Sequence, residues 1–367
     1  MRILHISTAQ SWRGGEQQLA YLLGELKSKP LFQSVFCFRG SAIEAFCVEN
    51  KIEYFSVSHS SAYNPILLYK LHVYCKKFNF QILHAHDSHA HTLAILAVVI
   101  LGLKTNIVLS RKVDFPLRKN FFTMFKYNHP AVKKIICVSK KIESILTPDV
   151  KNKKILTCIY DGINLKKFSK VSNRKLRKEY DLAEQTIIIG NVAALADHKD
   201  YFTFVNTAEI LLKTGLDAIF LIFGEGSQKE AIAQYIHEKA LDKHIKLAGF
   251  RSEIASLLPE FDLFLFTSKT EGLGSSILDA YACEVPVVTT NAGGIPEIVK
   301  HNVTGLLASP GDAQALAAEC LRVISDKELR NLLVKNASEL VLGFSKEVMG
   351  NSTFLVYSEL EKSLKES

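Results

Sequence analysis

The stretch that decides the fold is residues 263–297, which read LFLFTSKTEGLGSSILDAYACEVPVVTTNAGGIPE. Two short apolar runs, 263–266 and 286–290, are separated by a polar, glycine-containing loop and a helical segment. Each run is apolar along its length, as expected for a strand buried on both faces of a sheet. The order strand, loop, helix, strand therefore predicts two parallel strands joined by a crossover helix.

The same alternation extends along nearly the whole chain on both sides of this stretch. It predicts an α/β protein made of two Rossmann-like, doubly wound domains that face each other across a cleft. The predicted strands are 2–7, 34–39, 52–57, 82–85, 106–110, 134–139 and 155–159, then 186–192, 218–224, 245–248, 263–266, 286–290 and 305–308. A polar segment rich in Lys and Arg, 166–181, marks the junction between the domains, which we place at 1–165 and 166–345.

The charge of the chain is distributed unevenly between these domains. Of 367 residues, 48% are hydrophobic and 22% charged, which excludes an intrinsically disordered chain. The net charge is +8, but residues 1–165 hold 22 Lys/Arg against 10 Asp/Glu, so the first domain carries +12 and the rest −4. This asymmetry favours an anionic partner for the first domain.

The cysteines and the apolar runs indicate the compartment. Seven scattered cysteines without a C-x-x-C spacing are typical of free thiols in a reducing environment. The longest apolar run, 93–103, is shorter than the ~20 residues that span a bilayer. We therefore expect a cytoplasmic protein.

The loop after strand 263–266 carries a candidate anion site. Gly272 and Gly274 allow the backbone to come close to a ligand, and Ser275 or Ser276 can cap the following helix. The free amides at the start of that helix, together with its dipole, suit a diphosphate.

Two carboxylates accompany this site. Glu271 precedes it, and Asp279 lies about one turn into the helix, so the two could bind sugar hydroxyls on either side of a diphosphate. The alternative is an ordinary capped crossover helix with a solvated Glu271.

Residues 271–297 resemble the signature of the retaining glycosyltransferases of family 4, which have the GT-B fold. That signature consists of two acidic residues separated by seven others, followed by P-V-V-x-T-x-x-G-G-x-P-E; here the acids are Glu271 and Asp279. Segments 2–16, 161–168, 223–226 and 247–251 are also similar to the family, so the resemblance covers most of the chain.

The resemblance implies roles for the matching residues. Glu271 would face the donor sugar and Asp279 the ribose of a nucleotide sugar, and Lys199 would neutralise the leaving diphosphate, which makes Glu271 and Lys199 the predicted catalytic residues. Without the family, Lys199 would be interpreted as a solvated lysine at a helix start. The implied donor-binding residues are Gly14, Gly15, Lys199, Gly224, Arg251, Glu271, Gly274, Ser275, Ser276, Ile277 and Asp279. The resemblance also implies that 346–367 is a helix returning to the first domain, and that no metal or other cofactor is needed.

The sequence departs from the family pattern at three places. The second acid is Asp279 where the family has Glu, so its reach is shorter. The segment 193–195 lacks the arginine common in the family, and 108–114 lacks its histidine. In place of that histidine, Arg111 could bind a phosphate of the donor or of the acceptor, and Asp114 could bind a hydroxyl. We assign both to the acceptor side, with a solvated turn as the alternative.

Histidines gather instead at 84, 86, 89 and 91, around Asp87. So many histidines close together could indicate a metal site. However, their spacing crosses from a strand end into a helix start, so the four side chains cannot all face one point. By the resemblance, this loop lies on the acceptor side. We therefore predict His86 and His89 as acceptor contacts, with structural packing as the alternative and no metal. The chain also lacks G-x-G-x-x-G, which argues against a nicotinamide or flavin enzyme.

A basic and aromatic segment, 104–141, holds ten Lys/Arg and one acid, interleaved with phenylalanines. Such a segment suits the surface of an anionic membrane, at about 1 kcal/mol per basic residue near the surface. The alternative is a helix whose phenylalanines pack in the core and whose lysines are solvated. No nucleic-acid motif accompanies the charge, so no nucleic-acid partner is expected.

Taken with these observations, the resemblance implies a retaining glycosyltransferase that moves a sugar from a nucleotide-diphosphate sugar to a glycan or lipid-linked acceptor in envelope polysaccharide or lipopolysaccharide synthesis. Such an enzyme would be cytoplasmic and could be peripheral at the inner membrane face. The alternatives are a nucleotide-sugar epimerase or hydrolase on the same fold, and a catalytically idle protein that binds sugar nucleotides.

Overall fold

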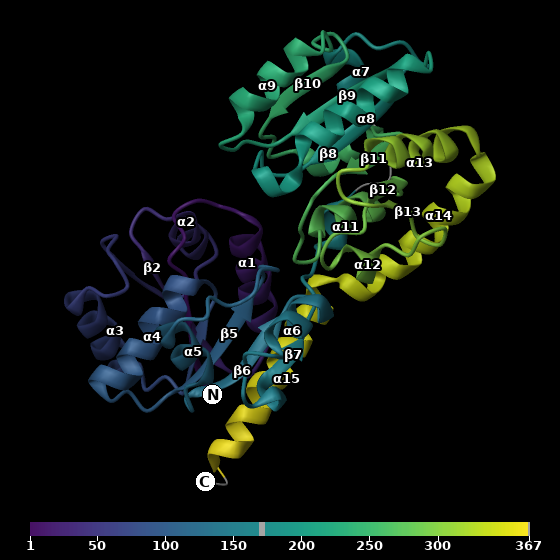
Figure 1. Ribbon diagram of the computed structural model, residues 1–367. Helices are drawn as coiled ribbons and strands as arrows, with labels where there is room; N and C mark the ends of the chain where they lie inside the picture. Colours follow the sequence, from purple (N-terminus) through teal and green to yellow (C-terminus); the bar gives the residue numbers. More distant parts are fainter. Residues whose placement is uncertain (169–172, 366–367) are drawn as a thin grey trace. The chain divides into compact units, whose positions relative to one another are not determined.

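The computed structural model describes residues 1–168 and 173–365 (Figure 1). The chain divides into two compact units, one formed by Met1–Gly162 with the segment from Lys346 onward, the other by Ile163–Ser345. Each unit is an α/β layer structure around a parallel sheet, which confirms the predicted fold class. The division at Gly162 falls just before the junction expected from the polar segment.

The first unit contains, in its described residues, a seven-stranded parallel sheet of order β3-β2-β1-β4-β5-β6-β7. The strands are β1 (Arg2–Ile6), β2 (Phe32–Phe38), β3 (Tyr54–Val57), β4 (Ile82–Ala85), β5 (Asn106–Arg111), β6 (Val132–Cys137) and β7 (Leu156–Cys158). The helices are α1 (Gly14–Leu26), α2 (Ala42–Glu49), α3 (Pro65–Phe78), α4 (Ser88–Leu101), α5 (Phe121–Asn128), α6 (Lys140–Leu146), the short η1 (Lys153–Ile155) and α15 (Lys346–Lys365).

The second unit contains, over residues 163–168 and 173–345, a six-stranded parallel sheet of order β10-β9-β8-β11-β12-β13. The strands are β8 (Ile187–Val192), β9 (Ala218–Phe223), β10 (Ile245–Gly249), β11 (Leu263–Phe266), β12 (Val287–Thr290) and β13 (Leu306–Ala308). The helices are α7 (Lys175–Glu179), α8 (Tyr201–Lys213), α9 (Lys229–Glu238), α10 (Ile254–Leu257), α11 (Ser275–Ala282), α12 (Ile295–Ile298), α13 (Ala313–Ser325) and α14 (Lys327–Leu340), with the short η2 (Leu165–Lys167), η3 (Asp197–Lys199), η4 (Leu258–Glu260) and η5 (Val341–Phe344).

Every strand expected from the sequence is present, because continuous apolar runs identify strands that are buried on both faces. The apolar run 93–103 lies mostly within α4. Among the described residues, no helix is both long enough and apolar enough to cross a membrane.

The strand order places the loops after β1 and β4 next to one another, and likewise the loops after β8 and β11. In the first unit the order reverses between β1 and β4, and in the second between β8 and β11. At such a switch point the two neighbouring crossovers leave in opposite directions, so the loops after the two strands border a crevice at the carboxyl edge of the sheet. The loops after β8 and β11 are the segments that hold Lys199 and Glu271.

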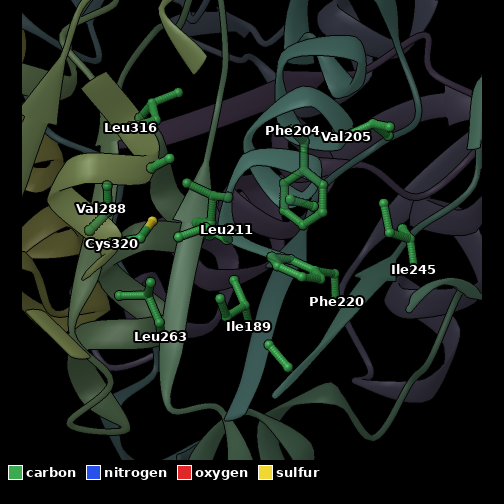
Figure 2. Close-up of a cluster of buried hydrophobic side chains, with 14 of the residues drawn as sticks. Ile189, Phe204, Val205, Leu211, Phe220, Ile245, Leu263, Val288, Leu316 and Cys320 are labelled. Atoms are coloured by element: carbon green, nitrogen blue, oxygen red, sulfur yellow. The ribbon is translucent and has the colours of Figure 1, made fainter. Parts of the chain in front are cut away.

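The core of the second unit lies between its sheet and helices α8 and α13, and it fixes the strands that carry these loops (Figure 2). Phe204 and Phe220 meet edge to face with ring centroids 6.1 Å apart. The side chains drawn and labelled are Ile189, Phe204, Val205, Leu211, Phe220, Ile245, Leu263, Val288, Leu316 and Cys320.

The last helix, α15, belongs to the core of the first unit although it follows the second unit in sequence. Its buried residues Val356 and Tyr357 join a cluster with Leu22 of α1. The hydroxyl of Tyr357 lies 2.5 Å from Nδ1 of His84, and Lys346 forms an ion pair with Glu25. The helix therefore fastens the end of the chain to the strands of the first unit.

Gly190 in β8 gives a sharp test of the packing in the second unit. A Cβ at this position would lie 2.0 Å from the ring of Phe261, so Gly190→Ala should lower the free energy of unfolding by about 2–3 kcal/mol in urea titrations. Gly24→Ala is the control, because Gly24 is exposed in α1 and a Cβ there meets no described atom within 4 Å. It should be neutral or slightly stabilising; equal losses for both variants would contradict the packing.

Candidate functional site

Lys199 and Glu271 meet in an ion pair at the carboxyl edge of the second sheet. Lys199 ends η3 after β8, and Glu271 lies in the loop after β11, so a sequence separation of 72 residues is closed by strand pairing. The two side chains are only 15% and 10% exposed. The ammonium of Lys199 also lies 4.9 Å from the centroid of the Phe266 ring. A nearly buried carboxylate is thus matched by a nearly buried cation.

Several hydrogen bonds fix the loop after β11 to its neighbours. The hydroxyl of Thr267 lies 3.1 Å from the carbonyl oxygen of Lys199, and the amide of Lys269 donates to the carbonyl of His198. The hydroxyl of Ser268 donates to Oε1 of Glu271 at 3.0 Å. These bonds hold the carboxylate against η3.

The Gly-Gly turn after β12 packs directly on Glu271. Gly293 has φ +53°, and a Cβ there would lie 2.0 Å from the carbonyl oxygen of Glu271. The amide of Gly294 donates to that same oxygen at 2.9 Å. Glycine is therefore required at 293 for a structural reason, since any side chain would displace the backbone of Glu271.

Helix α11 begins immediately after this loop. Its N-cap is Gly274 with φ +89°, and no side chain caps it, so the expected capping by Ser275 or Ser276 is wrong. The serines occupy the first two helical positions instead, because the left-handed turn at Gly274 starts the helix one residue earlier. The first amides of a helix, including those of 275 and 276, have no partner within the helix and can bind an anion. The third predicted amide, of Ile277, donates to the carbonyl of Gly274 at 2.9 Å.

Asp279 lies in α11, one turn after the serines. Burial raises the pKa of its carboxyl to about 7, and the positive charge of Lys167 opposes part of this effect. At neutral pH a large fraction of this carboxyl is therefore protonated and can donate as well as accept a hydrogen bond.

Two other predicted donor-binding residues have structural partners. Gly224 has φ +149°, and a Cβ there would lie 1.9 Å from the carbonyl of Ala193, so packing against the loop after β8 accounts for this glycine. Arg251 forms ion pairs with Glu179 and Glu253. In the described residues no hydrogen bond or ion pair joins it to Lys199 or Glu271.

The sequence did not predict the buried polar network that Tyr201, Asn191 and Leu265 form near the site. The hydroxyl of Tyr201 donates to Asn191 Oδ1 at 2.8 Å, and the amide of Asn191 donates to the carbonyl of Leu265 at 2.7 Å. Burial, reinforced by the charge of Glu271, raises the pKa of Tyr201. The one available signal was a polar Asn near the end of an otherwise apolar strand.

In the first unit, Gly14 and Gly15 begin α1. A Cβ at either position would meet no described atom within 4 Å, so packing does not require glycine there and the space beside them is open. The side chain of Glu16 accepts from the amide of Arg13 at 3.1 Å, which satisfies a backbone donor at this helix start.

The predicted acceptor-side histidines separate in the structure. His86 follows β4 and shares a hydrogen bond of 3.0 Å with His5 of β1, while its ring centroid is 4.0 Å from that of His84. His89 is exposed on α4 and His91 is buried, so the four histidines do not face one point, as predicted. The potential ligand atoms of His5, His84 and His86 lie within 4.8 Å of one another, and burial lowers the pKa of all three.

The sequence analysis missed His5, although strand pairing places it directly opposite His84. Its contribution to the cluster depends on the pairing of β1 with β4, which are about 80 residues apart in sequence.

Arg111 and Asp114 lie at and after the end of β5. Arg111 is 7% exposed, so it does not belong to a solvated turn. Asp114 is half-buried in the loop that follows. The neighbouring Lys112 pairs with Asp161 at 2.6 Å.

The basic segment 104–141 is divided between core and surface. Lys126 and Tyr127 of α5 are buried, whereas Phe115 and Phe121 are 59% and 87% exposed. Phe125 stacks on Phe121 with ring centroids 6.3 Å apart and is itself partly exposed. The alternative interpretation, in which the phenylalanines pack in the core, is therefore wrong for Phe115 and Phe121.

Comparisons with known proteins identify relatives over most of the chain. The family model described as Glycosyl transferases group 1 matches residues 172–340, and that described as Glycosyltransferase Family 4 matches residues 12–167. The N-acetyl-alpha-D-glucosaminyl L-malate synthase of Bacillus anthracis is 26% identical over 298 residues, covering 80% of this chain and 78% of that protein.

Two further relatives are informative. The UDP-Gal:alpha-D-GlcNAc-diphosphoundecaprenol alpha-1,3-galactosyltransferase of Escherichia coli is 26% identical over 293 residues, covering 76% of this chain and 75% of that protein. The structure of Anabaena HepE in complex with UDP and glucose matches with a TM-score of 0.83 at 20% identity, covering 98% of this chain and 99% of that one. This last likeness establishes the GT-B fold.

The pKa of Asp279 makes a prediction for stability. Because its folded pKa of about 7 lies above its ordinary value of 3.8, the protonated carboxyl stabilises the fold fully below pH 4, and this stabilisation is lost as the pH rises through 7. Asp279→Asn keeps a neutral group at every pH. Its stability relative to the parent should rise by about 2 kcal/mol between pH 5 and 8.5, since one pKa unit corresponds to about 1.4 kcal/mol and partial exposure screens the charge.

Urea unfolding of both proteins at pH 5, 6, 7 and 8.5 measures this difference. The exposed Glu230 supplies the control, because Glu230→Gln should shift stability by only a few tenths of a kcal/mol and without a trend over this pH range. A flat difference for Asp279→Asn would show that its carboxyl is ionised throughout.

Proposed function

The chain belongs to the glycosyl transferases group 1 family, and on that premise we propose that it transfers a sugar from a nucleotide-diphosphate sugar to a glycan or lipid-linked acceptor, with retention of the anomeric configuration. The reaction would serve the synthesis of a cell-envelope polysaccharide or lipopolysaccharide.

The observation that carries this proposal is the Lys199–Glu271 pair beside the start of α11. It brings together, at a switch point of the second sheet, a cation, a carboxylate and the free amides of a helix start. A nucleotide sugar needs these three groups: amides for its diphosphate, a cation for its negative charge, and a carboxylate for its sugar hydroxyls.

The chemistry follows from where charge develops. When the bond between the sugar and the diphosphate breaks, negative charge grows on the departing phosphate oxygen. An ammonium at Lys199 stabilises this charge more strongly in the transition state than in the bound donor, which is what accelerates a reaction. Since the lysine and the amides together supply positive charge, we propose that no metal ion is required at the diphosphate.

The acceptor proposal rests on the relatives and on charge. The name of the Escherichia coli relative specifies a diphosphoundecaprenol-linked acceptor, which is anionic and held in a membrane. The first domain defined from the sequence carries a net charge of +12, which suits such an acceptor.

Substitution of the two central residues tests the proposed reaction. Glu271→Gln and Lys199→Ala should each lower kcat by about 10²–10³-fold, since each removes a charge proposed to act on the donor. The assay uses whichever UDP-, GDP- or ADP-sugar raises the melting temperature most, and NMR of the product reads its anomeric configuration. Lys243→Ala, an exposed lysine of the same unit, is the control and should retain parental turnover.

The outcomes separate the alternatives. Donor consumption at full rate without acceptor would indicate a hydrolase or epimerase, and binding without turnover would indicate an idle binding protein. Unchanged turnover in both site variants would place the chemistry elsewhere, and activity lost in EDTA would refute the proposed independence of metal.

We further propose that the first unit docks on an anionic membrane through residues 104–141, as a peripheral protein at the inner face. Phe115 and Phe121 are exposed beside Arg118 and Lys119, which are also exposed. Apolar rings flanked by cations favour the interface of a negatively charged bilayer.

Liposome co-sedimentation tests this docking. Binding should increase with anionic lipid content, and the double variant Phe115→Ser/Phe121→Ser should weaken it at least tenfold, because it removes the two most exposed rings of the segment. The matched control is Tyr69→Ser on α3, a ring of 64% exposure outside the segment. Binding that is indifferent to anionic lipid would refute the proposal.

A further inference from the structure

We propose that Arg111 and Lys126 form a binding site for a phosphoryl group of the acceptor, at the carboxyl edge of the first sheet. The inference rests on the proposed function for the identity of the acceptor. The site itself rests on two buried cations for which the described part of the chain shows no ion pair.

Both cations are almost fully buried. Arg111, the last residue of β5, is 7% exposed, and Lys126 of α5 is 6% exposed. Within residues 1–168 and 173–365 neither forms an ion pair with a carboxylate. Buried charges are normally paired, because removing a cation from water without compensation is costly.

Asp87, whose charge acts on Lys126, already accepts from other donors. Asp87 caps α4 by accepting from the amide of Ala90 at 2.8 Å, and it accepts from the amide and hydroxyl of Thr8, both at 2.7 Å. Its two oxygens therefore serve three donors already. In addition, the N-terminus of α4 contributes the positive end of a helix dipole to the same region.

Lys126 and Arg111 are also incompletely bonded. Among the described residues, the ammonium of Lys126 donates to Thr92 Oγ1 at 3.2 Å and to the two oxygens of Ser88 at 3.4 and 3.5 Å, distances that are long for a charged donor. The Nε of Arg111 is buried without a partner. Burial and the charge of Arg111 lower the pKa of Lys126, and the charge of Asp87 opposes them, so a further anion beside the ammonium would favour its charged form.

The arrangement fits a phosphoryl group better than a carboxylate. Two cations match the charge of about −2 on a phosphate monoester or on a whole diphosphate linkage, and a guanidinium presents its donors in a fork suited to phosphate oxygens. The hydroxyl of Ser88 lies beside the ammonium and adds a neutral donor, whereas the hydroxyl of Thr92 already donates to the carbonyl of Ser88 at 3.0 Å. Two bonds orient Arg111: Nη1 donates to the hydroxyl of Tyr127 at 3.2 Å, and Nη2 donates to the carbonyl of Phe115 at 2.5 Å. Two of its five N–H donors are engaged in this way, and the buried Nε is among the others.

The position suits an acceptor. β5 pairs with β4, whose following loop holds Asp87, so the two cations lie at the edge where parallel sheets bind ligands. The ring of Phe115 covers the guanidinium with 4.9 Å between Cζ and the ring centroid, and Phe115 is itself exposed.

Titration of the full chain with inorganic phosphate, followed by calorimetry and thermal unfolding, tests the site. Lys126→Met keeps the aliphatic stem and removes the charge, and it should weaken phosphate binding at least tenfold. Arg111→Lys keeps the charge but loses the fork and should weaken it as well. The control is Lys70→Met, an exposed lysine of α3, which should bind phosphate as the parent does.

Phosphate could also bind at the start of α11, but Lys126→Met leaves that helix unchanged. The difference in phosphate affinity between the parent and the variant therefore reports on the Arg111–Lys126 site. Without phosphate, Lys126→Met should unfold no earlier than the parent, since it removes an unpaired buried charge. A lower melting temperature with unchanged phosphate affinity would instead assign Lys126 a purely structural role and overturn the proposal. Titration with UDP separates the two proposals: if the parent fails to bind UDP while the Lys126 effect persists, only the proposed function fails.

Discussion

The ion pair of Lys199 with Glu271 is the interaction on which the second unit's site depends. A carboxylate that is nine-tenths buried is stable as an anion only if a cation and hydrogen-bond donors surround it. Lys199 supplies the cation and Ser268 supplies a hydrogen-bond donor to the carboxylate of Glu271. Gly293 can approach the backbone of Glu271 because it has no side chain. Gly293 and the hydroxyl of Ser268 therefore both help to hold the carboxylate of Glu271 in place.

The two units treat buried charge differently. In the second unit, the nearly buried Lys199 and Glu271 are matched to each other, so the site is preorganised before any ligand arrives. In the first unit, Arg111 and Lys126 are buried and form no ion pair in the residues that the structure describes, and Asp87 accepts from three other donors. This difference agrees with the distribution of charge along the sequence, in which the excess of positive charge belongs to the first domain. The buried cations of the first unit can therefore bind an anionic ligand, whereas the charges of Lys199 and Glu271 in the second unit neutralise each other.

Topology explains why both regions lie at carboxyl edges. In each sheet the order reverses once, between β1 and β4 or between β8 and β11, and the loops after those strands become neighbours. Residues far apart in the chain, such as His5 and His84, are then brought together by strand register alone. Helix α15 completes the first unit from the far end of the chain, where Tyr357 contacts His84.

The sequence by itself determined the strands, the two α/β units and the loops that carry Lys199 and Glu271. Continuous apolar runs identify buried parallel strands, and glycines and acids after a strand identify a loop that can bind a ligand. It did not determine which residue caps α11, because the left-handed turn at Gly274 depends on how the loop packs. Nor could it show that Arg111 and Lys126 are buried together, or that His5 joins His84 and His86. Those facts depend on strand register and helix packing, which bring distant residues into contact and which no local pattern encodes.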